Sequence, residues 1–216
     1  MAKTDERYTV PLYTIGLAAS HLGMKPATLG SWVNKKELLT SVPAKRPFPQ
    51  LPFMGLVEAQ VCFELRRAGL SMQAITGGMR QVRQRLGSRM LLEGVLAHDG
   101  KNILMNLAKS GDPEWTRAID LQGGLPQVIE IGLRLVTWDS EGIPQTVRLS
   151  AYQDAVVTAD PRYAFGQPVI QGTTVRVEDV LSLFKAGDPI ETVCAEMDIP
   201  QAVVESIVRT HVALAA

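Results

Sequence analysis

Cysteine, aromatic residues and long apolar runs are scarce in this sequence. Among its 216 residues, two are cysteines and 6% are aromatic. Cys62 and Cys194 lie far apart on apolar helical patterns without CxxC spacing, so we expect reduced packing residues rather than a disulfide or metal ligands. No apolar run approaches the roughly 20 residues that cross a bilayer. Residues 1–7 lack the apolar core of a signal peptide, which predicts a cytoplasmic protein without a membrane partner.

The motifs that carry common enzyme chemistry are also missing. There is no GxxxxGKS/T or GxGxxG pattern for binding phosphates, and no GxSxG pattern for a nucleophilic serine. The three histidines, His21, His98 and His211, fall in three different segments and have no acidic residue or cysteine at ligand spacing. We therefore expect a protein that is not an enzyme and that has no catalytic residue, metal or cofactor.

The net charge of zero conceals a division between the two halves of the chain. Residues 1–90 contain 13 lysines and arginines against 5 acidic residues, which is 13 − 5 = +8. Residues 91–216 contain 9 against 17, which is 9 − 17 = −8. The basic half can neutralise phosphates, whereas the acidic half would repel them. The division predicts a nucleic-acid partner for the first half, and mutual attraction of the two halves within a dimer is the alternative.

Residues 14–32 have the pattern of a helix-turn-helix. Ile15, Ala18 and Leu22 form one apolar face, Gly23 permits a tight turn, and Pro26 lies in the first turn of a second helix. The segment is similar to the amino-terminal module of MerR-type regulators, whose pattern reads YTIGEAAxxLGVxPxTLxxW. A plain helical hairpin is the alternative. The matching residues are Tyr13, Thr14, Ile15, Gly16, Ala18, Ala19, Leu22, Gly23, Pro26, Thr28, Leu29 and Trp32.

This resemblance implies a DNA-binding region over residues 8–90, with a recognition helix that begins near Pro26. Gly30 and Ser31 stand where such modules often place an arginine, so we expect contacts mainly to phosphate oxygens. The proline-rich residues 40–52 are expected to be either a wing that touches the DNA backbone or a spacer. The candidate DNA-binding residues are Lys25, Thr28, Ser31, Asn34, Lys35, Lys36, Lys45 and Arg46.

A second helical hairpin is predicted between residues 57 and 86. Two apolar stripes at helical spacing, over residues 57–68 and 72–86, are separated by a turn at Gly69. The arginines of this hairpin form either a solvated face or a contact to DNA or to a second subunit. They are Arg66, Arg67, Arg80, Arg83 and Arg85.

Residues 91–153 are predicted to form a small β-rich region. Hairpins are expected at residues 94–107 and 136–149, with a short helix at residues 125–135 between them. Because such a sheet is too short for an enzyme core, we expect it to form a dimer contact or a rigid spacer.

Residues 154–216 have the pattern of a β-hairpin followed by three helices. Residues 169–170 and 175–177 are the predicted strands, and Gly172 supplies the positive φ of the turn between them. A glycine ends the first helix, and a proline begins each of the other two. These residues are Gly187, then Pro189 with Asp188 as its N-cap, and Pro200.

This last segment resembles a prokaryotic domain family of unknown function, whose members often act as antitoxins in VapB-type toxin–antitoxin pairs. The resemblance rests on Gly166, on residues 168–170 and on residues 172–173, and Thr174 stands where the family signature has an arginine. Because the last two helices are mostly acidic, a basic protein surface fits them better than a duplex does, and packing within the protein or a dimer is the alternative. The candidate toxin-binding residues are Glu191, Glu196, Asp198 and Glu205.

Together these features predict an α+β protein that is mainly helical and contains a small antiparallel sheet. As the resemblance implies, we expect an antitoxin that neutralises a PIN-domain ribonuclease of the VapC type and represses its own operon by binding operator DNA as a homodimer. Two alternatives stay open. One is a stand-alone MerR-like regulator without a toxin partner, and the other is a scaffold whose helix-turn-helix units bind only protein.

Overall fold

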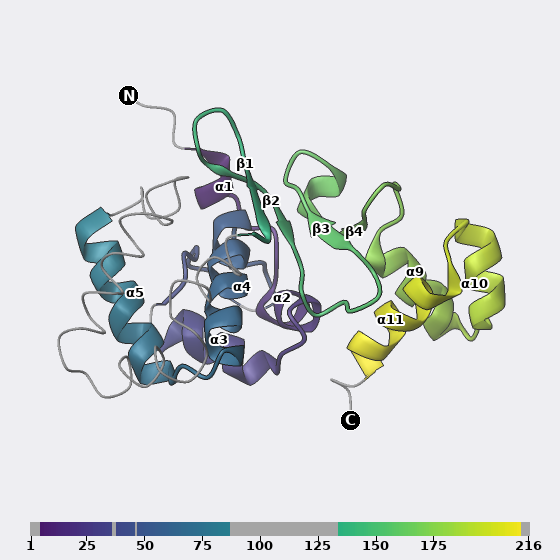
Figure 1. Cartoon of the computed structure of the whole chain (residues 1–216), viewed down its shortest axis with the longest axis horizontal. Coiled ribbons are helices and arrows are strands. Elements are labelled where there is room, and N and C mark those ends of the chain that lie inside the picture. The colour runs from purple at the N-terminus through teal and green to yellow at the C-terminus, as the bar shows by residue number, and fades with distance from the viewer. Residues whose placement is uncertain (1–4, 36–37, 46, 87–133, 213–216) are drawn as a thin grey trace.

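The computed structural model describes residues 5–35, 38–45, 47–86 and 134–212. Helices and one antiparallel sheet make up this part of the chain, which confirms the α+β class. The amino-terminal helices lie on one side of the sheet's first strands, and the carboxy-terminal helices extend from its other end (Figure 1). None of the described helices has the length and apolar character that crossing a bilayer requires. The hairpin expected at residues 94–107 lies outside the described residues, as does most of the helix expected at residues 125–135.

The first helices follow local signals in the sequence. After the short α1 (Glu6–Thr9), α2 (Ile15–His21) begins at Thr14, whose hydroxyl accepts a hydrogen bond from the Leu17 amide at 3.1 Å. Gly23, with φ +66°, forms the turn, and α3 (Pro26–Asn34) starts at the expected proline. Two helices joined by a tight turn therefore stand where the sequence predicts them.

The second pair of helices consists of α4 (Phe53–Arg67) and α5 (Met72–Leu86), separated by Gly69 at φ +99°. The sequence predicts a single apolar stripe on α4, but this helix is buried on nearly all sides. Its polar residues Glu58, Gln60 and Glu64 are buried as well, because α1, α5 and β2 pack against this helix. Helix α4 is thus the central element of the fold.

A four-stranded antiparallel sheet has the order β1-β2-β3-β4. The expected hairpin is present as β1 (Val136–Trp138) and β2 (Pro144–Arg148), and Val136 pairs with Val147. The sequence analysis missed β3 (Val157–Ala159), which joins β2 to β4 (Val169–Ile170). One sheet therefore spans the predicted division between residues 153 and 154.

The carboxy-terminal helices are α9 (Val177–Ala186), α10 (Ile190–Met197) and α11 (Gln201–Val212). Gly187 ends α9 in the left-handed conformation, as predicted. Two details differ from the prediction. Val177, expected in a strand, is already the first residue of α9. In place of the predicted second strand of the hairpin, β4 pairs with the following segment through an isolated bridge between Val169 and Arg176. Pro189 and not Asp188 is the N-cap of α10, because Pro189 has extended backbone and no side chain caps the helix.

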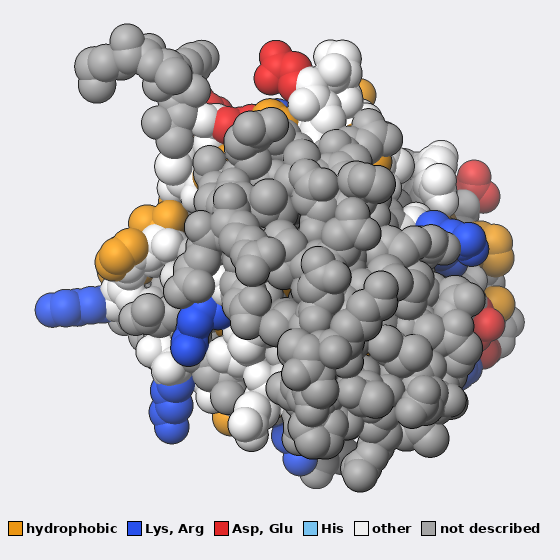
Figure 2. Space-filling view, turned by 60° about the vertical axis from the view of Figure 1, so that its left-hand side comes forward, with side chains coloured by type: hydrophobic (Ala, Val, Ile, Leu, Met, Phe, Trp, Pro, Cys, Tyr) orange, Lys and Arg blue, Asp and Glu red, His pale blue; other side chains and the backbone are white. Residues whose placement is uncertain are grey.

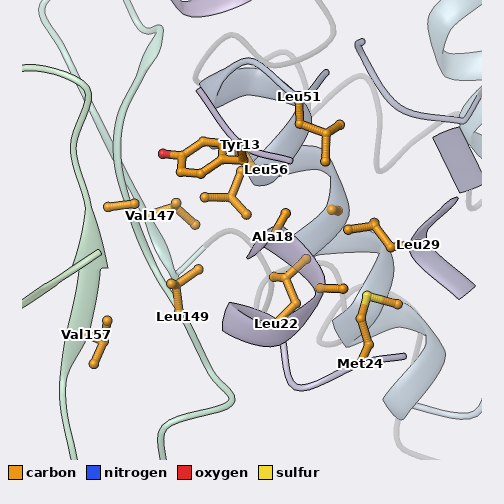
Figure 3. Packing of buried hydrophobic residues seen from close by; sticks show 14 of the residues in the cluster. Tyr13, Ala18, Leu22, Met24, Leu29, Leu51, Leu56, Val147, Leu149 and Val157 are labelled. Carbon is orange, nitrogen blue, oxygen red and sulfur yellow. The ribbon is translucent and has the colours of Figure 1, made fainter. Parts of the chain in front are cut away.

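The hydrophobic core joins both halves of the chain. Figure 3 shows Val147 of β2 and Leu149 just after it on the side of the core that faces Leu22, at the end of α2, and Leu56 of α4. Tyr13 is fully buried, and its hydroxyl donates a 2.6 Å hydrogen bond to the carbonyl oxygen of Gly166. Helix α11 in turn packs against α2. Both the core and this hydrogen bond hold the two halves of the chain in one body.

Candidate functional site

Helix α3 presents the predicted DNA-binding residues on its outer side. Leu29, Trp32 and Val33 of α3 are buried against the core. On the opposite side, Thr28, Asn34 and Lys35 are exposed, Ser31 is half-buried, and Lys25 is exposed at the N-cap position. The side chain of Asn34 donates to the carbonyl oxygen of Gly30 at 3.1 Å, so one of its donors is already used. The candidate residues described here are therefore all at least partly accessible at α3 and its N-cap.

The proline-rich connector after α3 contributes Lys45, which is exposed. The connector folds back on itself where the Val42 amide donates to the carbonyl oxygen of Gln50 at 2.8 Å, and its end lies against the segment before α2 through the bridge from Tyr13 to Leu51. Lys36 and Arg46, the other two candidates of this region, lie outside the described residues. Over residues 38–45 and 47–52 no helix forms, as the prolines require.

The predicted toxin-binding residues lie in a different part of the molecule, on α10 and α11 (Figure 1). Glu191, Glu196 and Asp198 are exposed. Glu205 is half-buried and accepts a hydrogen bond from the side chain of Gln201 at 2.7 Å. Across residues 190–212 these four acidic residues stand against Arg209 alone, a formal charge of 1 − 4 = −3.

Figure 2 shows one face of the molecule, where lysine and arginine side chains project at the left, lower and right edges and acidic side chains appear at the top and right edge. Side chains of both signs therefore occur together at the right edge. The charge division of the sequence does not appear as two separate regions on this face of the described residues.

Two histidines that the sequence places far apart meet at one tyrosine. His21 of α2 and His211 of α11 lie on either side of Tyr152, with His21 Nδ1 2.8 Å and His211 Nε2 2.9 Å from the tyrosine hydroxyl oxygen. His21 and Tyr152 are buried, and His211 is half-buried. His21 Nε2 has no hydrogen-bond partner among the described residues. The expectation that the histidines belong to separate segments missed this cluster.

Burial keeps both histidines of the cluster neutral. Desolvation lowers the pKa of His21 to about 3 and that of His211 to about 4, and it raises the pKa of Tyr152 above its usual value. A neutral imidazole has one donor and one acceptor nitrogen. The arrangement with the smallest desolvation penalty has His21 Nδ1–H donating to the Tyr152 oxygen and the tyrosine hydroxyl donating to His211 Nε2. His21 Nε2 is then an acceptor without a partner, and no buried N–H donor is left unpaired. The cluster is therefore a hydrogen-bonded link between α2 and α11, and the described residues bring no set of three His, Cys, Asp or Glu side chains into a metal-binding group.

A strained aromatic loop is a second feature that the sequence analysis missed. Ala164 and Phe165 have φ values of +46° and +53°, which non-glycine residues seldom adopt. Phe165 is 89% exposed, and Tyr163 nearby is 64% exposed. The loop is anchored to the core at Gly166, whose carbonyl oxygen accepts a hydrogen bond from the buried Tyr13 hydroxyl. A rigid, exposed aromatic side chain of this kind suits contact with another protein.

Beside this loop lies a groove of about 590 Å³ that α1 and the β1–β2 hairpin also line. Arg7 crosses it, donating to Asp5 at 2.9 Å and to Asp139 at 2.7 Å. The hydrogen bond to Asp5 raises the pKa of Arg7 above its usual value. Arg7 and Asp139 are 132 positions apart in sequence, so no local pattern could have revealed this pair.

Comparison with known proteins gives one family match, one similar named protein and one similar solved structure. The family described as "Protein of unknown function (DUF433)" matches residues 157–209. A protein of Mycobacterium tuberculosis (strain ATCC 25618 / H37Rv) named "Putative antitoxin VapB45" is 30% identical, over 89% of this chain and 90% of that protein. The X-ray crystal structure of Rv2018 from Mycobacterium tuberculosis matches with a TM-score of 0.76 and 30% identity, over 94% of this chain and 99% of that chain.

Proposed function

Because the chain belongs to the same family as the protein named "Putative antitoxin VapB45", we propose that it is the antitoxin of a toxin–antitoxin pair. The observation that carries this proposal is the 30% identity over 89% of the chain, which includes both the basic and the acidic half. The toxin would be a PIN-domain ribonuclease of the VapC type, as the VapB-type resemblance implies.

The acidic face of α10 and α11 is the proposed toxin-binding surface. Glu191, Glu196 and Asp198 are exposed there, and Glu205 on α11 is half-buried. A nucleic-acid-cutting enzyme needs a basic surface for its substrate, so an acidic partner can cover that surface by charge complementarity. The exposed Phe165 would add an apolar anchor elsewhere on the chain.

The outer face of α3 is the proposed DNA-binding surface, through which the antitoxin would repress its own operon. Lys25 and Lys35 supply positive charge, and Thr28, Ser31 and Asn34 supply hydrogen-bonding groups. Two such helices in a homodimer would read paired half-sites, which compensates for the small number of base-reading side chains on each.

The toxin arm is tested by co-expressing the chain with the product of the neighbouring reading frame and measuring growth rescue and co-purification. Glu191→Lys with Glu196→Lys should reduce both, because the changes place positive charge against a basic partner. Glu141→Lys, on the exposed turn of the β1–β2 hairpin, is the control. Full rescue by the double variant would remove α10 from the toxin surface, and no rescue by the unaltered chain would refute the antitoxin function.

The DNA arm is tested by retardation of the upstream DNA at low salt. Lys25→Glu with Lys35→Glu should weaken retardation and reduce its dependence on salt, because two phosphate contacts are lost. Toxin rescue should survive in this variant, since its surface is separate. Retardation by the unaltered chain without any effect on a toxin would favour the second candidate, a stand-alone MerR-like regulator. That candidate is favoured by the pairing of α2 and α3 around Gly23.

A further inference from the structure

A cleft of about 420 Å³ lies where the two halves of the chain meet. It is bordered by the α2–α3 turn at Gly23, by the end of α4, by residues 150–153 and by α11. Two arginines line it, Arg67 from α4 and Arg209 from α11, and none of the described residues that line it is acidic. Two guanidinium groups held on separate helices therefore border one cleft.

The guanidinium groups of these arginines have spare donors. Arg67 Nη1 lies 3.6 Å from Glu64 Oε1, and Arg209 Nη1 lies 3.7 Å from Asp154 Oδ2, which are ion contacts beyond hydrogen-bonding distance. Their side chains are 56% and 62% exposed. By contrast, Arg7 donates hydrogen bonds of 2.5–3.0 Å to its carboxylates. Arg67 also stacks over the Phe63 ring at 5.9 Å, a contact that leaves its N–H donors free for a ligand in the plane of the guanidinium group.

The floor of the cleft is fixed by a buried polar network and close packing. The Glu64 carboxylate accepts hydrogen bonds from the Ser150 hydroxyl and from Gln60 Nε2, which also donates to Ser150 Oγ at 2.8 Å. The Glu64 oxygen nearest to Arg67 is thus already engaged. A methyl group added to Gly23 would lie 3.0 Å from the Ala151 side chain, so the turn and the floor are in near contact.

We propose that this cleft binds a phosphate group through Arg67 and Arg209. A guanidinium group donates two parallel hydrogen bonds to a phosphate, and such charge-assisted bonds are about twice as strong as neutral ones. A volume of 420 Å³ exceeds that of a lone phosphate and suits a group attached to a larger molecule. Since Gly23 is two residues before Lys25, one source of the phosphate is the backbone of a duplex docked on α3. The other source is a free phosphate-bearing ligand.

The test compares Arg67→Gln with Arg209→Gln against a matched control that also removes two exposed positive charges, Arg148→Gln with Lys185→Gln, neither of which lines the cleft. Binding of a random-sequence duplex is measured by fluorescence anisotropy over a range of salt concentrations, and binding of pyrophosphate by titration calorimetry. Circular dichroism and the melting temperature establish that both variants are folded. The duplex measurement rests on the proposed DNA binding, whereas the pyrophosphate measurement does not.

If the phosphate belongs to a duplex, the cleft variant should reduce the slope of log affinity against log salt by about 2, one unit for each lost contact, and the control should leave it unchanged. If it belongs to a free ligand, pyrophosphate should bind the unaltered chain and the control but not the cleft variant. Equal behaviour of the cleft variant and the control in both measurements would overturn the proposal. If the unaltered chain binds no duplex, but binds pyrophosphate and the cleft variant does not, only the proposed DNA binding is refuted. If the unaltered chain binds neither probe, both the DNA binding and the phosphate site are refuted.

Discussion

Acid should destabilise this protein through His21, and the size of the effect follows from its burial. The pKa of His21 is lowered to about 3 in the folded chain, while an unfolded histidine titrates near 6.5. The neutral form is therefore favoured by folding, so this contribution to stability is present above pH 6.5 and is lost as the pH falls toward 3.

Between pH 7 and pH 5 the unfolded chain takes up most of one proton at this position, whereas folded His21 stays neutral. At about 1.4 kcal/mol per pH unit for a full proton, the free energy of unfolding should fall by about 2 kcal/mol from His21 alone. His211 acts in the same direction, because burial lowers its pKa to about 4.

The measurement is urea denaturation at pH 5, 6 and 7, followed by circular dichroism, for the unaltered chain and for His21→Gln. Other titrating groups are common to both proteins, so the difference between their pH dependences isolates His21. The decline from pH 7 to pH 5 should be smaller in the variant by about 2 kcal/mol. His211→Gln should reduce the decline by a similar amount, since a pKa of about 4 also keeps folded His211 neutral at pH 5. An identical decline in His21→Gln and the unaltered chain would refute the reasoning.

Three further changes test the aromatic loop and its anchor. Tyr13→Phe should lower the free energy of unfolding by about 1–3 kcal/mol in urea denaturation, because the buried carbonyl of Gly166 loses its partner, and an unchanged value would contradict that role. Gly166→Ala should cost more than Gly69→Ala in the same assay: both have positive φ, but a methyl at Gly166 would lie 2.7 Å from Leu12 Cδ1, whereas Gly69 has no atom within 4 Å. Equal costs would refute the close approach. Phe165→Ala should leave stability within about 0.5 kcal/mol in thermal melts, because this side chain is 89% exposed, and a larger loss would mean that it packs within the fold.

The helices were predictable because their boundaries are set by local chemistry. Glycines with positive φ at residues 23, 69 and 187 separate the helical segments where the sequence places its turns. Thr14 and Pro26 likewise begin α2 and α3 as expected. In each case one or two neighbouring residues decide the conformation, so no knowledge of tertiary contacts is needed.

The missed features all depend on residues that are distant in sequence. Strand β3 has three residues, and its position is set by pairing with β2 and β4 rather than by its own pattern. The hydrogen bond between His21 and Tyr152 joins residues 131 positions apart. The burial of Glu64 depends on Ser150, 86 positions away, which supplies its hydrogen bond. Sequence patterns within one segment carry no information about such pairs.

The candidate DNA-binding and toxin-binding residues were chosen from charge and helical spacing, and these choices stay predictions. The structure places the described ones on two separate surfaces, with Lys25 and Lys35 at α3 and Glu191 and Glu196 at α10. For the cleft arginines, the sequence predicts only that Arg67 lies on the arginine-bearing side of a helical hairpin, and it assigns Arg209 no role. That they line one cleft follows from the packing of α11 against the first half of the chain.

The position of β3 inside the sheet has a consequence for proteins that contain only the carboxy-terminal family unit. Residues 157–209 begin at β3, whose outer edge is covered here by β2 from the preceding segment. A chain that started at residue 157 would present the unpaired backbone amides and carbonyls of that strand to solvent. It would need a strand from another molecule, or a different extension, to close the sheet. The β1–β2 hairpin therefore covers the edge of β3 and prevents this strand from pairing with a strand of another molecule.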